Sequence, residues 1–156
     1  MEGRRVSDSA SEYSELALPN DANSLGNLLG GKIMHLVDLC GAIAAMRHSR
    51  SPVVTASVDH MEFIHPVHIG QMVRLRSSVN RAFRTSMEVG VKVWVEDLIQ
   101  GEQKHVSSAF LTFVAIDKAG DRVEVPPVIP ETEDEKRRYE DAGKRREYRL
   151  SHRRPR

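Results

Sequence analysis

One long apolar helix followed only by strands is the feature that most restricts the folds open to this chain. Between Ile33 and Met46 nearly every position is apolar, and Asp38 stands in the middle of the run. The run begins at a double glycine and ends near Arg47, which predicts a single helix. Because its apolar residues cover most of the helix circumference, we expect other elements to wrap around it.

Four segments after this helix have the residue pattern of β-strands. Each is rich in β-branched residues or alternates apolar with polar positions, and short polar links separate them. The segments are residues 52–63, 72–82, 86–96 and 105–117. Period-two strands joined in this way are typical of an antiparallel sheet. One buried helix with a sheet wrapped around it is an α+β fold.

The two ends of the chain differ in composition from this central part. Residues 1–14 are polar and rich in serine, without periodicity, and we expect them to be disordered. Residues 131–156 hold ten Lys or Arg and seven Asp or Glu, which predicts a solvated helix with a capping box at Thr132 and Glu135. One globular domain is therefore expected at residues 15–130, followed by a charged C-terminal helix.

Bulk composition excludes several classes of function. The 156 residues suffice for one domain, and a net charge of +1 does not favour nucleic acid or a membrane surface as partner. We find no segment with the length of a transmembrane helix and no apolar signal-peptide core at the N-terminus. The single cysteine, Cys40, cannot form an internal disulfide. These features predict a cytoplasmic protein.

The carboxylate of Asp38 needs a physical reason for its place in an apolar helix. An ionised carboxylate away from water is costly unless it is paired or hydrogen-bonded, and His35 is its only polar neighbour on the helix. Asp38 is therefore either a structural residue bonded to another element or part of a cleft. Upstream, Gly30 and Gly31 place unpaired N–H groups at a helix start, where they can stabilise a developing oxyanion.

At four places the sequence resembles the hotdog-fold acyl-CoA thioesterases, of the cytosolic acyl-CoA hydrolase type and its small bacterial relatives. The matching segments are NSLGNLLGGKIMHLVDLCGAIAAMRH, VVTASVDHMEFIHPVHIGQMVRL, RTSMEVGVKVWVE and SSAFLTFVAID. The resemblance extends from about residue 19 to residue 127. It implies a hotdog fold, in which a single antiparallel sheet wraps a long central helix. It also implies dimers, which usually assemble into trimers of dimers, with active sites at the dimer interface.

The same resemblance implies hydrolysis of an acyl-CoA thioester to a fatty acid and CoA. The family's catalytic aspartate falls on Asp38, as general base or as nucleophile, and its asparagine falls on Asn23, supplied by the partner subunit. The backbone N–H at or near Gly31 would polarise the thioester carbonyl. No metal and no separate cofactor are expected, since CoA is part of the substrate.

Residues for binding CoA are expected near RTSMEV and at the helix start. We assign Gly30, Arg81, Arg84 and Ser86 to this role, because arginine suits the phosphates of CoA and glycine allows close approach of a ligand. A solvated strand edge is the alternative interpretation of the same arginines.

Other candidate groups fit catalysis or metal binding less well. Cys40 has only apolar neighbours one helical turn away, so a packed thiol is expected rather than a nucleophile. His60, His65 and His68 lie close in sequence, but a zinc site would need further convergent ligands, so no metal site is expected.

Two alternatives to hydrolysis remain open on the same fold. A non-catalytic acyl-CoA sensor would bind the ester without cleaving it. A hotdog dehydratase would rely on a histidine paired with an acid, for which His35 and Asp38 have a possible spacing.

Overall fold

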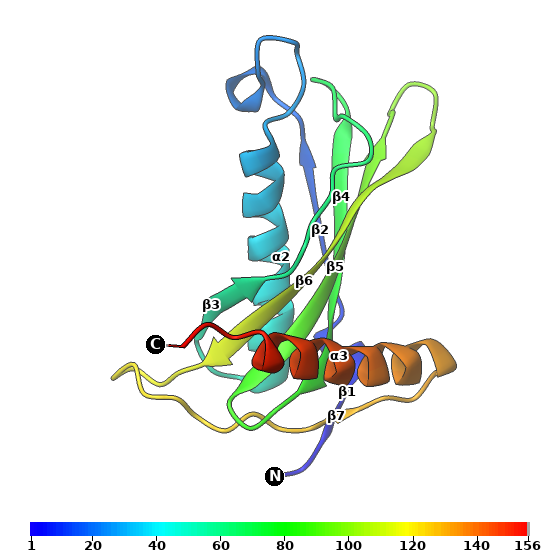
Figure 1. The fold of residues 1–156 in the computed structure, drawn as a ribbon. Helices are drawn as coiled ribbons and strands as arrows, with labels where there is room; N and C mark the ends of the chain where they lie inside the picture. Colours follow the sequence, from blue (N-terminus) through cyan, green and yellow to red (C-terminus); the bar gives the residue numbers. More distant parts are fainter. Residues whose placement is uncertain (156) are drawn as a thin grey trace.

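A curled five-stranded antiparallel sheet wraps one side of a long helix in the computed structural model, which describes residues 1–155 (Figure 1). The strand order is β2-β4-β5-β6-β3. The sheet consists of β2 (Ser11–Leu16), β4 (Met72–Ala82), β5 (Ser86–Glu96), β6 (Gln103–Ala115) and β3 (Val53–Val58). The α+β architecture expected from the alternating pattern is confirmed, and the bounds of β4 and β5 are those predicted.

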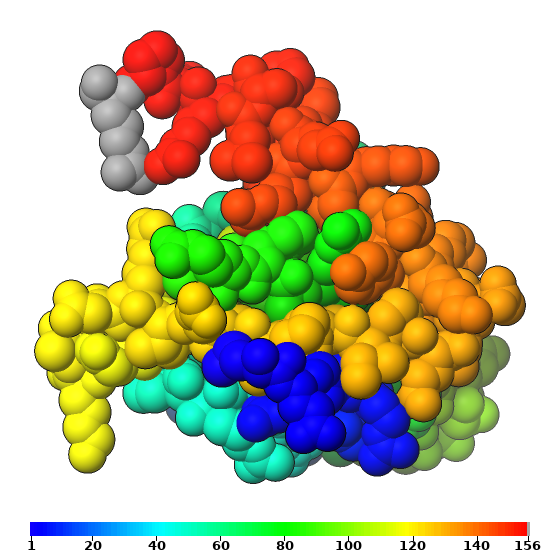
Figure 2. All heavy atoms as spheres, turned by 90° about the horizontal axis from the view of Figure 1, so that it is seen from below, coloured from blue at the N-terminus to red at the C-terminus, as the bar shows by residue number. Residues whose placement is uncertain are grey.

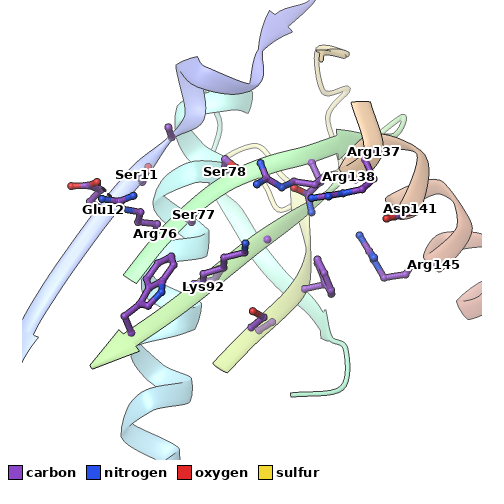
Figure 3. Close-up of a pocket in the computed structure, with 18 residues that line it drawn as sticks. Ser11, Glu12, Arg76, Ser77, Ser78, Lys92, Arg137, Arg138, Asp141 and Arg145 are labelled. Carbon is purple, nitrogen blue, oxygen red and sulfur yellow. Dashed lines mark ion pairs between the residues drawn. The ribbon is translucent and has the colours of Figure 1, made fainter. Parts of the chain in front are cut away.

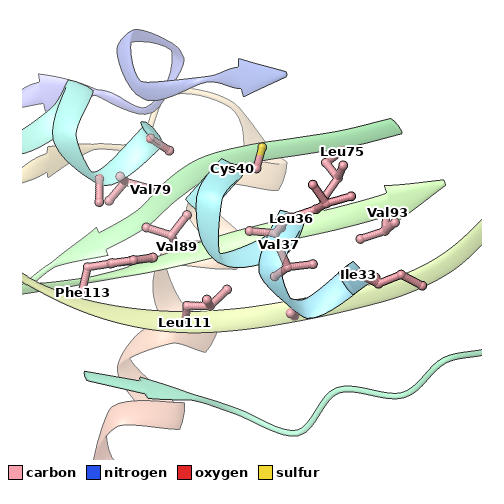
Figure 4. Packing of buried hydrophobic residues seen from close by; sticks show 14 of the residues in the cluster. Ile33, Leu36, Val37, Cys40, Leu75, Val79, Val89, Val93, Leu111 and Phe113 are labelled. Carbon is pink, nitrogen blue, oxygen red and sulfur yellow. The ribbon is translucent and has the colours of Figure 1, made fainter. Parts of the chain in front are cut away.

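The central helix α2 (Gly30–Ser49) packs its apolar side into the concave face of the sheet. Figure 4 shows side chains from both elements interdigitating in this core. Its labelled members are Ile33, Leu36, Val37, Cys40, Leu75, Val79, Val89, Val93, Leu111 and Phe113, all at most 3% exposed. Burial of a side chain of this size contributes roughly 1.5–3 kcal/mol, so this interface supplies most of the driving force for folding.

The face of α2 turned away from the sheet is open. Met34, Leu39 and Met46 lie there with exposed side chains, and Asp38 is half-buried. The expectation that other elements surround the helix is therefore wrong within one chain. A five-stranded sheet covers one side of a helix only, so the remaining apolar positions are left for another surface.

The N-terminal segment is ordered, and the prediction of disorder for residues 1–14 is wrong. It forms β1 (Arg4–Arg5), α1 (Val6–Ser9) and the edge strand β2, which pairs with β4 from Ser11 to Leu16. An edge strand is stabilised largely by backbone pairing and needs few apolar side chains, so its composition carries little signal. Figure 2 shows the N-terminal residues against the chain that leads to α3, where β1 pairs with β7 (Val128–Ile129).

β3 is shorter than predicted, because the strand ends at Val58 rather than near residue 63. Two backbone hydrogen bonds to β6 hold the segment that follows, from Asp59 N to Phe110 O and from Ile64 N to Val106 O, both at 2.8 Å. A β-bulge interrupts the register of β3 with β6 between Thr55 and Ser57. The outer edge of β3 has no neighbouring strand among the described residues.

The C-terminal helix α3 (Glu133–Ser151) lies across the outside of the sheet, so it is solvated as predicted on its outer face and packs against the sheet with the other (Figure 1). It begins as predicted, with Thr132 Oγ1 accepting a hydrogen bond from Glu135 N at 3.1 Å. The Glu135 carboxylate bonds Glu131 N instead of the cap residue. The helix is held by arginine contacts with the sheet, of which Arg145 to Glu88 is the most buried. A 3-10 turn (Pro19–Asp21) completes the elements, and no helix of residues 1–155 has the length and apolarity to cross a membrane.

Candidate active site

Asp38 is bonded to Thr55, a residue that the sequence analysis did not single out. The Thr55 hydroxyl donates to Asp38 Oδ1 at 2.6 Å, joining the middle of α2 to the edge strand β3. A hydrogen bond of this length to a carboxylate is among the strong ones, and it fixes one oxygen while the other stays available. No spacing rule joins a helix to a strand 17 positions later, so only the fold reveals this pair.

The Asp38–Thr55 pair lies on the open side of the chain. Thr55 is exposed and Asp38 half-buried, so water and a ligand can reach both. His35 makes no hydrogen bond to Asp38 in the part of the chain that the structure describes. The histidine–acid pair considered for a dehydratase is therefore not formed.

Free N–H groups lie at the start of the same helix. Lys32 N and Ile33 N both bond Leu29 O, whereas the two preceding N–H groups have no acceptor within residues 1–155. A Cβ at Gly31 would meet nothing within 4 Å, and one at Gly30 would lie 3.7 Å from the Phe63 ring. Gly31 thus leaves open space beside unpaired donors, as an oxyanion site requires.

Gly31 and Asp38 share one side of α2 but lie apart along it. Seven residues at 1.5 Å each separate them by about 10 Å. One small reacting group cannot contact both positions of a single helix. The expectation that two helices contribute to one site therefore stays a prediction.

Asn23 lies in the loop before α2 and shapes that loop with its own side chain. Its Oδ1 accepts hydrogen bonds from Leu25 N at 2.9 Å and from Asn27 N at 3.1 Å. Its side chain is exposed, and its amide N–H groups have no acceptor among the described residues. Asn23 and Asp38 are not in contact, so one chain does not bring these two predicted residues together.

Gly30 begins α2, whereas the other residues predicted to bind CoA, Arg81, Arg84 and Ser86, lie at the other end of the sheet. Figure 1 shows the β4–β5 turn beside α3, away from the start of α2. Arg81 donates to Tyr139 O at 3.3 Å and stacks 4.1 Å from the Tyr139 ring, so it supports α3. Ser86 Oγ accepts a hydrogen bond from Arg146 at 3.4 Å, and Arg84 is exposed. Of the three, Arg84 alone is free to meet a phosphate.

Cys40 is fully buried, as expected of a packed thiol. Its Sγ donates to Ser77 Oγ at 3.3 Å, and burial raises the pKa of the thiol. The histidines of the predicted turn also lie apart: His60 pairs with Glu62, while His68 Nδ1 is 2.6 Å from Asn27 Oδ1. Within residues 1–155 no three His, Cys, Asp or Glu side chains converge on a metal position.

Comparison with curated proteins identifies relatives of this chain among thioester hydrolases. An uncharacterised acyl-CoA thioester hydrolase, YkhA of Bacillus subtilis, is 45% identical over 117 residues, which cover 75% of this chain and 68% of that protein. Acyl-coenzyme A thioesterase 11 of mouse is 41% identical over 139 residues. That match covers 89% of this chain but 23% of the mouse protein, so the chain spans about a quarter of that relative's length.

Solved structures show the same fold over nearly the whole chain. An apo-hexameric acyl-CoA thioesterase superposes with a TM-score of 0.93 and 40% identity, covering 97% of both chains. An acyl-CoA hydrolase of Staphylococcus aureus in complex with butyryl-CoA, CoA and CoA disulfide gives 0.89 and 34%, covering 96% of this chain and 92% of the other. Alanine variants of that hydrolase, which replace one asparagine, one aspartate or one threonine, were also solved.

These likenesses confirm the hotdog fold that the sequence motifs imply. Residues 25–102 match the family described as the thioesterase superfamily, and this region includes α2, β3, β4 and β5. The chain belongs to the thioesterase superfamily.

Proposed function

We propose that this chain hydrolyses acyl-CoA thioesters, with Asp38 and Thr55 at the reacting centre. The observation that carries the proposal is the 2.6 Å hydrogen bond between these residues on the open side of α2. The bond orients the carboxylate, and exposure gives it access to water and substrate. Relatives named as acyl-CoA thioesterases support the substrate class.

The residues replaced in the S. aureus hydrolase have the spacing of three residues in this chain. Its asparagine and aspartate are 15 positions apart, and its threonine follows 17 positions after the aspartate. Asn23, Asp38 and Thr55 have the same two separations. The coincidence supports Asn23 and Asp38 as the functional pair and adds Thr55 to it.

Asp38 acts in this proposal as a general base on water. The carboxylate takes a proton as the water oxygen bonds to the thioester carbon, and the carbonyl oxygen gains negative charge. The N–H at Gly31 stabilises that charge, and Asn23 orients the water or the substrate. Collapse of the adduct breaks the carbon–sulfur bond, and CoA leaves as its thiol after taking up a proton. Direct attack by the carboxylate is the rival role.

Two protomers complete one site in this proposal, because neither Asn23 nor Gly31 reaches Asp38 within a chain. The unpaired edge of β3 and the exposed apolar residues of α2 form one continuous open side, which suits pairing with a second copy. Such dimers would then build the larger assembly, as in the hexameric relative.

The first experiment measures CoA thiol release from a panel of short to long acyl-CoAs. Wild type should hydrolyse part of the panel, and Asp38→Asn should lose at least about a hundredfold in kcat with unchanged assembly by light scattering. Transfer of ¹⁸O from labelled water into the Asp38 carboxylate during turnover would favour the nucleophile over the base. If wild type binds acyl-CoA but releases no thiol, the proposal of hydrolysis is refuted and the non-catalytic sensor is favoured.

The second experiment mixes two inactive variants to test the shared site. Asp38→Asn and Asn23→Ala protomers are combined under dissociating conditions and reassembled. If each site uses Asn23 from one protomer and Asp38 from the other, mixed dimers hold one intact site and about a quarter of wild-type activity returns. If both residues act within one chain, no mixture recovers activity.

A further inference from the structure

A groove on the outer face of the sheet is separate from the Asp38 site. Its floor is formed by β4, β5 and β6, and its walls by β2 on one side and α3 on the other. Its volume is about 780 Å³, which is in the range of pockets for small molecules. Figure 3 shows α2 on the far side of these strands, so the sheet lies between the groove and the central helix.

Basic side chains from three elements converge on this groove (Figure 3). They are Arg76 of β4, Lys92 of β5, and Arg137, Arg138 and Arg145 of α3. Facing them are two acidic residues, Glu12 and Asp141, and a third carboxylate lies beneath Arg145. Asp134, which pairs with Arg137, is a fourth carboxylate, so the five cations exceed the carboxylates around them by one positive charge.

Two of these cations have no partner of their own. Arg76 pairs with Glu12 at 3.1 Å, and Arg137 pairs with Asp134 at 3.4 Å. Within residues 1–155, neither Lys92 nor Arg138 has a carboxylate oxygen within 4.0 Å. Lys92 enters the groove from its floor and Arg138 from its α3 wall (Figure 3).

Arg145 gives the groove one rigid wall. Its Nε and Nη2 donate to the fully buried Glu88 at 2.7 and 2.9 Å, and its guanidinium lies 3.7 Å from the centre of the Phe110 ring. Asn80 donates to the same carboxylate at 2.9 Å. This buried network holds α3 at a fixed distance from the sheet, so the groove is formed before any ligand arrives.

Small residues form part of the groove floor. Gly90 faces it from the middle of β5, and a Cβ there would lie 3.0 Å from the Asn80 amide nitrogen. Ser78 of β4 pairs with Gly90, and Ser108 of β6 pairs with Lys92, two positions further along β5. Small residues at these three positions leave depth in a sheet face that larger side chains would fill, and the hydroxyls can donate to an anion.

We propose that this groove binds a phosphate-bearing anion held between Lys92 and Arg138. Two cations without a carboxylate partner suit a phosphate dianion, and arginine and lysine are the usual phosphate-binding side chains. The ring of Trp94 lies at the end of the groove, with the Arg76 guanidinium over it at 5.8 Å from the ring centre. The phosphates of CoA or of a separate ligand would present the same chemistry.

The test is calorimetric titration of the intact protein with inorganic pyrophosphate. The variant K92M/R138M removes the two unpartnered cations, and K118M/R122M is the matched control, because it removes one lysine and one arginine from an exposed turn. We expect affinity to fall at least tenfold in the first variant and to stay within twofold in the control. Pyrophosphate should also protect Lys92, but not Lys118, of wild type from acetylation.

Each outcome bears on the groove itself, independently of thioester hydrolysis. Absence of pyrophosphate binding, or equal weakening in both variants, refutes the proposal. Lys92 that resists acetylation without any anion also refutes it, because another copy of the chain then covers the groove. If pyrophosphate binds at the groove, a repeat titration with saturating CoA identifies the natural ligand. Loss of pyrophosphate binding assigns the groove to the phosphates of CoA, and retained binding assigns it to a separate ligand.

Discussion

The buried ion pair between Glu88 and Arg145 predicts a large and strongly non-additive effect on stability. The Glu88 side chain is fully buried, whereas that of Arg145 is 27% exposed. Arg145→Met leaves the Glu88 carboxylate inside the protein with Asn80 and, at 3.9 Å, Arg149. Loss of one partner of a buried pair costs about 3–5 kcal/mol, and these remaining contacts place the expected loss near the lower end.

Replacing Glu88 instead of Arg145 should cost less stability. Glu88→Met leaves a guanidinium that can turn toward water, and we expect a loss of about 1–2 kcal/mol. The double variant Glu88→Met with Arg145→Met removes both charges and fills the space with apolar groups. Its expected loss is about 1 kcal/mol, so the coupling energy between the two residues is about 3–4 kcal/mol.

The assay is equilibrium unfolding in urea at a fixed protomer concentration, since assembly makes apparent stability depend on concentration. Urea is preferred to guanidinium because a salt denaturant would screen the charges under study. Arg146→Met is the control: that arginine stacks 4.3 Å from the Phe83 ring and makes no ion pair among the described residues, so about 1 kcal/mol is expected. If the double variant loses the sum of the two single losses in free energy of unfolding, the predicted coupling between Glu88 and Arg145 is refuted.

Three further predictions concern single side chains. Thr55→Val should lower kcat by roughly tenfold to a hundredfold with little change in KM. Thr55→Ser should keep most activity, because the hydroxyl bonded to Asp38 is retained. Equal loss of kcat in both variants would show that the Thr55 methyl group, not the hydroxyl, supports activity. Burial lowers the pKa of His48 below its ordinary 6.5, against the opposing effect of its bond to Pro126 O. The neutral imidazole therefore stabilises the fold above about pH 6.5, and this contribution is lost as pH falls. In urea unfolding, wild type should lose more stability between pH 7 and pH 5 than His48→Gln does. Equal losses of stability in the two proteins would contradict this. The thiol of Cys40, whose pKa burial raises, should react with Ellman's reagent about a hundredfold slower in the native protein than in denaturant, and equal rates would show that the core is open.

The central part of the fold was predictable because it depends on periodicity. The alternation in residues 72–82 and 86–96 specifies one face for the core, and the structure has strands with those bounds. β2 was missed for a physical reason: Glu12 and Ser14 face outward, and the strand is held by pairing with β4 rather than by apolar side chains. The position of α3 was hidden in a similar way, since Arg145 finds its partner 57 positions away, at Glu88.

The candidate site was predictable only in part. Asp38 could be singled out because a carboxylate contrasts with the apolar residues around it. Thr55 gave no such contrast, because threonine is an ordinary residue in a strand, and its contact with Asp38 exists only after β3 has folded beside α2. The roles of Asn23 and Gly31 came from family resemblance, and one chain does not bring them to Asp38.

The bulge in β3 gives this strand a fixed length. It lies between two anchors on the same short segment: Thr55 bonds Asp38 before Ala56, and Asp59 bonds Arg149 at 2.8 Å after it. Removing or adding one residue between the anchors would turn every following side chain to the opposite face of the sheet. Thr55 would lose its carboxylate partner, or Arg149 would lose Asp59. The segment from Thr55 to Asp59 should therefore accept many substitutions but no insertion or deletion. Its number of residues, rather than their identity, sets the spacing between its contact with α2 and its contact with α3.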